Sequence, residues 1–219
     1  MIAVNSATLL AGQALRDAGP AAGASIRDGY ASFGPGSNNR IRGYRHRVNK
    51  PLLVVLAGRP GTGKTTLGRR LAAELRAAYL RIDAIEAAVV RCALAEHPVG
   101  PVGYVVAHEL AAATLAVGTP VIVDAVNPVP EARSGWRALA GDARLVVLET
   151  TLSDTAEHRR RVTARQPDLA GLAVPSWDKV VNGDYAIWDE SRDGPRHVID
   201  MLDTEQGVAA AVRHIRLGR

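Results

Sequence analysis

A glycine-rich run follows directly on an apolar segment that ends at Ala57. The run reads Gly58, Arg59, Pro60, Gly61, Thr62, Gly63, Lys64, Thr65 and Thr66. Glycines in such a run let backbone N–H groups wrap a phosphate chain, while the lysine reaches the terminal phosphates and the next hydroxyl takes Mg²⁺. A helical pattern begins near Lys64, so the positive end of that helix would point at the same anion. The run therefore predicts a P-loop over residues 58–66 that binds ATP with Mg²⁺.

The composition favours one α/β domain with an aliphatic core. The 219 residues are 47% hydrophobic but only 4% aromatic, so Ala, Val, Leu and Ile must fill the core, as they do in buried parallel strands. The net charge of +5 suits an anionic ligand, but it does not distinguish a nucleotide from a phosphorylated metabolite or a nucleic acid. The single cysteine, Cys92, excludes an internal disulfide, and we expect it to be a core residue of a helix.

No segment has the roughly 18 uninterrupted apolar residues that a membrane helix needs. The first residues also lack the basic start of a signal peptide. We therefore expect a soluble, cytoplasmic protein that makes no membrane contact and is a monomer or a homodimer.

Residues 1–47 differ in composition from the rest of the chain, being rich in Gly, Ala, Ser, Asn and Arg. We predict that they form an N-terminal extension, flexible or loosely attached, and that residues 48–219 form the P-loop domain. The basic stretch at 40–50 could contact the phosphates of RNA or of a substrate, although a solvated linker explains it more simply.

From Pro51 onward, strand-like and helix-like patterns alternate. We predict strands at 52–57, 79–83, 120–124, 144–150 and 196–200, and helices at 64–77, 84–95, 103–117, 130–140, 154–165, 176–182 and 205–216. This alternation indicates a parallel sheet covered by helices on both faces, that is, a three-layer α/β/α sandwich.

Two aspartates end predicted strands, at the sheet edge where α/β proteins bind ligands. Asp124 closes the apolar run 121–123, where it would hold Mg²⁺ together with Thr65; capping of the following loop is the alternative. Asp83 ends the predicted strand 79–83, where its carboxylate could take the proton of a substrate hydroxyl or only orient that hydroxyl. A cap for the next helix explains Asp83 almost as well.

A cationic helix and two polar residues complete the candidate site. Arg161 and Arg165 are four residues apart in the segment 157–165, so they would share a helix face and could clamp the migrating phosphoryl group. A solvated surface helix is the alternative. Asn127 and Arg133 follow Asp124 and could hold the acceptor substrate, although stabilisation of the loop explains Asn127 nearly as well.

The P-loop, the segments 82–86 and 118–124, and the arginine-rich helix occur here in the order found in a known group. In this respect residues 51–217 resemble P-loop kinase-like proteins of the zeta-toxin and chloramphenicol phosphotransferase type, often labelled AAA family ATPases. Segments 124–128, 158–165 and 175–188 resemble a bacterial branch of that group. The resemblance implies a five-stranded sheet of order 2-3-1-4-5, a helical lid over ATP at about 154–195, and a catalytic acid at Asp83.

One departure matters for function. AAA machines place a glutamate after the aspartate of the third strand, whereas Ala125 follows Asp124 here, which argues against mechanical ATP hydrolysis. We therefore predict an ATP-dependent phosphotransferase that acts on a hydroxyl of a small molecule, with Lys64, Asp83, Arg161 and Arg165 as catalytic residues. A polynucleotide or RNA-end kinase, with nucleic acid as partner, and a non-catalytic ATP-binding regulator remain as alternatives.

Overall fold

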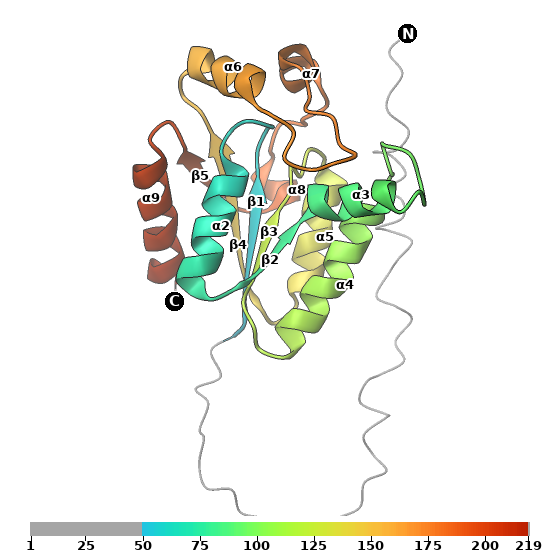
Figure 1. The fold of residues 1–219 in the computed structure, drawn as a ribbon. Coiled ribbons are helices and arrows are strands. Elements are labelled where there is room, and N and C mark those ends of the chain that lie inside the picture. The colour runs from blue at the N-terminus through green and yellow to red at the C-terminus, as the bar shows by residue number, and fades with distance from the viewer. Residues whose placement is uncertain (1–49, 219) are drawn as a thin grey trace, which may run out of the picture.

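The structure, a computed structural model, describes residues 50–218 (Figure 1). The predicted extension at 1–47 and nearly all of the basic stretch at 40–50 lie outside the described residues. Five parallel strands form one sheet in the order β2-β3-β1-β4-β5, which confirms the predicted order. The strands are β1 (Leu52–Ala57), β2 (Ala78–Arg81), β3 (Val121–Asp124), β4 (Arg144–Thr151) and β5 (His197–Asp200).

Helices cover both faces of this sheet, so the predicted three-layer architecture is confirmed (Figure 1). One face carries α2 (Lys64–Leu75) and α9 (Thr204–Leu217), and the other carries α4 (Val102–Ala116) and α5 (Pro130–Ala140). Helix α3 (Ile82–Arg91) packs on α4. Beyond the carboxyl ends of the strands lie α6 (Thr155–Ala164) and α7 (Trp177–Asn182), and a short helix, α8 (Glu190–Asp193), follows them. Within residues 50–218, no helix has the length and apolarity needed to cross a bilayer.

The central strand β1 shows why this apolar sequence forms a buried strand. Successive side chains of a strand point to opposite faces of the sheet. Val54 and Leu56 pack into the core beneath α2 and α9, whereas Leu53 and Val55 pack into the core beneath α4 and α5. Both faces are covered by helices, so β1 is apolar at every position and does not alternate with polar residues.

The strand register brings the ends of three strands to one edge. Leu56 of β1 and Arg81 of β2 both lie opposite Asp124 of β3. The P-loop leaves β1 at this edge, because β1 ends at Ala57. The order and register of the strands therefore place Arg81, Asp124 and the P-loop next to one another.

Some predicted boundaries were wrong. Strand β2 ends at Arg81 and α3 begins at Ile82, so Asp83 lies in the first turn of a helix and not at the end of a strand. An acidic residue there interacts favourably with the helix dipole, and the N-cap is Arg81, so Asp83 is not the cap either. Helix α8 was not predicted, because four residues are too few to show a helical period. Cys92 ends α3 as an exposed residue, not as part of the core.

Candidate active site

The P-loop has the backbone conformation that its glycines predict. Gly58, Gly61 and Gly63 have φ angles of 127°, 84° and 96°, which residues with a Cβ atom rarely adopt. Gly63 is also the N-cap of α2, and no side chain from residues 50–218 caps that end of the helix. The first N–H groups of α2 are therefore free to bind an anion, and the helix dipole favours one there.

Lys64 is held inside this loop. Its Nζ atom donates to the backbone oxygen of Gly58 at 2.8 Å and to that of Arg59 at 2.9 Å. Burial lowers the pKa of Lys64 to about 8, although the charges of Asp124 and Asp83 act in the opposite direction. Its hydrogen-bond partners in the described part of the chain are thus neutral carbonyl groups, and the charged oxygens of a phosphate would bind the ammonium group more strongly.

Asp124 and Thr65 lie together at the mouth of the loop. The Thr65 hydroxyl donates to Oδ2 of Asp124 at 2.7 Å, and the Tyr79 hydroxyl donates to the same oxygen at 2.6 Å. A carboxylate and a hydroxyl are hard oxygen ligands, which suit Mg²⁺. Among residues 50–218 no three His, Cys, Asp or Glu side chains cluster to hold a metal. Mg²⁺ bound here would therefore take its remaining ligands from phosphate and water, as is usual for this ion.

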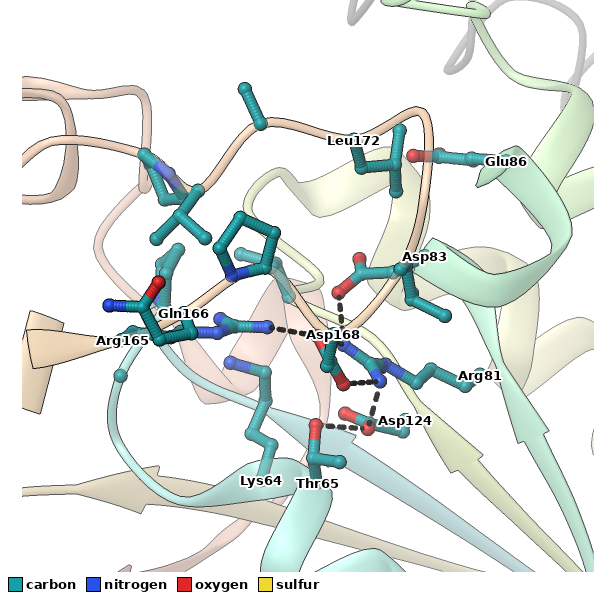
Figure 2. Close-up of a pocket in the computed structure, with 18 of the residues that line it drawn as sticks. Lys64, Thr65, Arg81, Asp83, Glu86, Asp124, Arg165, Gln166, Asp168 and Leu172 are labelled. Carbon is teal, nitrogen blue, oxygen red and sulfur yellow. Dashed lines mark hydrogen bonds and ion pairs between the residues drawn. The ribbon is translucent and has the colours of Figure 1, made fainter. Parts of the chain in front are cut away.

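A cavity of about 790 Å³ extends from the P-loop to the start of α3 (Figure 2). The segment between α6 and α7 crosses over the cavity and reaches α3. The two are in close contact at Gly171 of this segment, where an added Cβ atom would lie 3.1 Å from Cγ1 of Val90 on α3. Ionisable and polar side chains line both ends, and several residues of the crossing segment line the top. The lining includes Lys64, Thr65, Arg81, Asp83, Glu86, His97, Asp124, Arg161, Arg165, Gln166, Asp168, Leu169, Leu172, Val174 and Pro175.

The structure places Arg81, which the sequence did not single out, at the centre of the ionic network in this cavity (Figure 2). Its Nη1 donates to Oδ2 of Asp168 at 2.5 Å, and its Nη2 donates to Oδ2 of Asp83 at 3.2 Å. Its Nε lies 3.9 Å from Oδ2 of Asp124. Burial alone would lower the pKa of Arg81, but the hydrogen bond to Asp168 and the three acidic neighbours outweigh it and raise the pKa.

Arg81 and Asp168 differ in whether the sequence could have indicated their roles in this network. An arginine inside a predicted buried strand requires partners, because a buried charge without them is costly, so Arg81 could have been noticed. Asp168 lies in the irregular segment after α6, where no sequence pattern shows which way the chain runs.

The two predicted arginines of the clamp both line the cavity, but they are already engaged. Arg161 donates from Nε to Glu157 at 2.7 Å and from Nη1 to the Met201 oxygen at 2.9 Å. Arg165 donates to Asp168 at 3.3 Å. Helix α6 ends at Ala164, so Arg165 follows the helix in extended backbone and does not continue the face that carries Arg161.

Asn127 and Arg133, which the sequence predicted to bind the acceptor, have their polar side-chain atoms bonded within the protein. Asn127 donates to the Leu56 oxygen at 2.8 Å and accepts from Nε1 of Trp136 at 2.9 Å. Arg133 donates to Asp193 at 2.7 Å, and the side chains of this ion pair are 1% and 0% exposed. Neither Asn127 nor Arg133 lines the large cavity. Both instead stabilise the core behind the site, as the loop-stabilising alternative for Asn127 had it.

Side chains of the P-loop and of the segment above it also contact each other. Nε2 of His158, on α6, lies 2.8 Å from the Pro60 oxygen. Arg59 donates to the backbone oxygen of Val180 on α7. These contacts hold the P-loop against the two helices at the top of the cavity. The side chain of Arg59 therefore has a structural role, while its backbone remains part of the loop.

Glu86 is a further ionisable group at the α3 end of the cavity. Burial, together with the charge of Asp83, raises the pKa of Glu86 to about 7. Close packing contributes to this burial, because a Cβ on Gly103 would lie 2.7 Å from Cγ of Glu86. The α3 end of the cavity thus carries two carboxyl groups three residues apart.

The fold and the loop define the class of protein: a P-loop nucleotide-binding protein of kinase-like architecture. The chain belongs to the AAA domain family, since residues 53–175 match that family. A comparison with curated protein sequences gives no match.

Solved structures share the fold at low sequence identity. A "putative kinase" from Chloroflexus aurantiacus J-10-fl is 24% identical with a TM-score of 0.60, over 77% of this chain and 98% of that one. Kti12 from Chaetomium thermophilum, in complex with ADP-AlF3, is 21% identical with a TM-score of 0.56, over 74% and 96%. A sugar kinase from Janibacter sp. HTCC2649 is 17% identical with a TM-score of 0.54, over 74% and 93%. At these identities the similarity establishes the fold.

Proposed function

We propose that this protein transfers the γ-phosphoryl group of ATP to a hydroxyl group of a small molecule. The observation that carries the proposal is the continuous cavity that joins the P-loop to Asp83. Its volume of about 790 Å³ lies within the usual range for sites that bind small molecules. Two of the similar solved structures are described as kinases, which supports the same reaction class.

ATP would bind with its phosphates on the P-loop. The N–H groups of residues 58–65 and the Lys64 ammonium would receive the phosphate oxygens, and Lys64 would exchange its carbonyl partners for them. Thr65 and Asp124 would hold Mg²⁺, which when bound neutralises phosphate charge and orients the terminal phosphates. Because their hydrogen bond is 2.7 Å long, the two oxygens already lie close enough together to bind one ion.

The transfer itself would take place at the α3 end of the cavity. The acceptor hydroxyl would donate a hydrogen bond to Asp83, whose side chain is 43% exposed and borders the cavity. As the bond from the acceptor oxygen to the γ-phosphorus forms, the bond from that phosphorus to the bridging oxygen breaks, ADP leaves with the electron pair, and Asp83 takes the proton. Arginine side chains on the cavity wall would stabilise the charge on the migrating group.

The segment above the cavity would keep water out. Its apolar residues Leu169, Leu172, Val174 and Pro175 line the top of the cavity. Exclusion of water favours transfer to the acceptor over hydrolysis of ATP and strengthens the electrostatic interactions inside.

The direct test is transfer of label. Purified protein with Mg²⁺ and γ-labelled ATP is incubated with pooled sugars, nucleosides, antibiotics and short RNAs, and labelled products are identified by mass. We expect label on one small-molecule pool, its loss in Lys64→Ala, and an unchanged rate in Arg70→Ala, which changes a surface ion pair with Glu205. Label only on RNA would favour the polynucleotide kinase, and ATP binding without any labelled product would favour the regulator.

The role of Asp83 is tested by Asp83→Asn. Asparagine can accept a hydrogen bond from the hydroxyl but cannot take its proton. A loss of roughly 100-fold or more in kcat would indicate general-base catalysis, whose usual contribution is of that order. A near-normal kcat would indicate that Asp83 only orients the hydroxyl.

A further inference from the structure

Arg81 lies between the two halves of the proposed reaction. Its side chain is 5% exposed, yet it lines the cavity. On one side its Nε is 3.9 Å from Asp124, which accepts a hydrogen bond from Thr65 of the P-loop. On the other side its Nη2 donates to Asp83. A phosphoryl group that moves from the P-loop to a hydroxyl at Asp83 must therefore pass close to this guanidinium.

The other cations of the cavity lie near Arg81 but are held in different ways. The charges of Arg165 and Arg81 both lower the pKa of Lys64, after the larger effect of burial, so the three cations converge on one region. Arg161 is held by Glu157 and by the backbone oxygens of Met201 and Leu202. Nε of Arg81, in contrast, is buried and has no hydrogen-bond partner among the described residues.

We propose that Arg81 is a further catalytic residue, which contacts the migrating phosphoryl group, and that Asp168 is a positioning residue that holds its guanidinium from the segment above. The proposal rests on the proposed function. In the transfer described above, the charge spread over the three equatorial oxygens would be met by the fork of Arg81 N–H groups, whose planar geometry suits phosphate. Arg81 gives up no proton in this step.

A purely structural role makes a different prediction. If Arg81 served only to tie the segment that carries Asp168 to the sheet, its loss would weaken every nucleotide complex alike. A catalytic contact is stronger in the transition state than in the ground state, so its loss should weaken a transition-state analogue selectively.

The experiment compares the dissociation constant of Mg²⁺ and ADP alone with that of Mg²⁺ and ADP with aluminium fluoride, which imitates the migrating group. The ratio is the dissociation constant of ADP divided by that of ADP with aluminium fluoride, so a high ratio means selective binding of the analogue. It is measured by calorimetry for the wild type, Arg81→Lys, Arg81→Ala, Asp168→Asn and the surface control Arg70→Ala. We expect Arg81→Ala to lower the ratio by roughly 100-fold, the usual effect of removing one such donor, with the ADP constant nearly unchanged. Arg81→Lys should restore part of it, because the charge remains but the fork is lost.

Asp168→Asn separates the two roles. It keeps the arginine and weakens its tether, together with the hydrogen bond from Arg165, so we expect a smaller fall in the ratio than in Arg81→Ala. Arg81→Lys keeps a charge for the three carboxylates, so it remains informative even where Arg81→Ala does not fold. The assignment is overturned if Arg81→Lys and Arg81→Ala keep the wild-type ratio, whatever its value, which includes the case in which the dissociation constants of ADP and of the analogue rise to the same extent. Failure of label transfer to every acceptor would refute the proposed function instead, because the binding ratio requires no acceptor.

Discussion

The buried Lys64 gives the P-loop a pH dependence that can be calculated. Its pKa is lowered from 10.5 to about 8, chiefly by burial. Below pH 8 the folded and the unfolded chain both hold the proton, so pH has no effect through this group. Between about pH 8 and 10.5 only the unfolded chain holds it, so raising the pH favours the folded state. This is opposite in sign to a lysine that gains a carboxylate partner on folding.

The magnitude follows from the width of that window. Each pH unit within it corresponds to about 1.4 kcal/mol in the free energy of unfolding. The full window would give roughly 3 kcal/mol, and the interval from pH 8 to pH 10 gives less, because it is shorter and each titration is gradual. We therefore expect about 2 kcal/mol between pH 8 and pH 10.

The assay is urea unfolding of the wild type and of Lys64→Met at pH 7, 8, 9 and 10. Every other group titrates alike in both proteins, so the difference between their free energies of unfolding isolates Lys64. This difference should be constant from pH 7 to 8 and then change in favour of the wild type. The matched control is Lys179→Met, since Lys179 is exposed and should give a flat difference throughout. A flat difference for Lys64→Met as well would refute the argument from burial.

Three further predictions concern the core, the loop and the metal. Asp193→Ala should lower the free energy of unfolding by about 3–5 kcal/mol, because it leaves the buried Arg133 guanidinium without its carboxylate; a loss below about 1 kcal/mol in urea unfolding would contradict this. Gly61→Ala should weaken ATP binding at least about tenfold by calorimetry, because its Cβ would lie 2.5 Å from Cγ2 of Val162 at a φ of 84°; wild-type affinity would show that the loop adapts. Thr65→Val should abolish the gain in ATP affinity on adding Mg²⁺, and a gain equal to that of the wild type would remove Thr65 from the metal site.

The sequence predicted the parts of the fold that depend on local patterns. The strand β1, the loop after it and the aspartate that closes β3 are each recognisable within a few residues, because period, glycine content and burial coincide there. The strand order was predicted on a different basis, a resemblance to known proteins, because no local pattern specifies it.

Two residues near the site show how much depends on side-chain direction. Asn127 follows a strand end, as a ligand-binding residue often does, but its φ of 51° is unusual for a residue with a side chain. Its amide is hydrogen-bonded to Leu56 and Trp136 in the core, away from the cavity. Arg81 shows the reverse case, because it is the last residue of β2 and its side chain reaches the cavity where the strand stops and α3 begins. The spacing of residues in the sequence indicates neither the positive φ angle of Asn127 nor the change from strand to helix after Arg81.

The cavity is lined by equal numbers of basic and acidic side chains. Its lining contains four Lys and Arg side chains and four Asp and Glu side chains, listed here in that order: Lys64, Arg81, Arg161, Arg165, Asp83, Glu86, Asp124 and Asp168. Each cation already has protein partners: backbone oxygens for Lys64, and carboxylates for the arginines, Glu157 just outside the lining among them. ATP must therefore displace partners and not merely fill a site.

This exchange of partners has a consequence for the segment above the cavity. Asp168, which comes from that segment, binds both Arg81 and Arg165, and these hydrogen bonds hold its pKa well below the ordinary value. When phosphate oxygens take over Arg81, the segment loses a charged anchor to the sheet, although the contacts of His158 with Pro60 and of Arg59 with Val180 remain. In the proposed reaction, the ionic network that would hold Arg81 near the migrating group would thus also link nucleotide occupancy to the position of the segment over the acceptor.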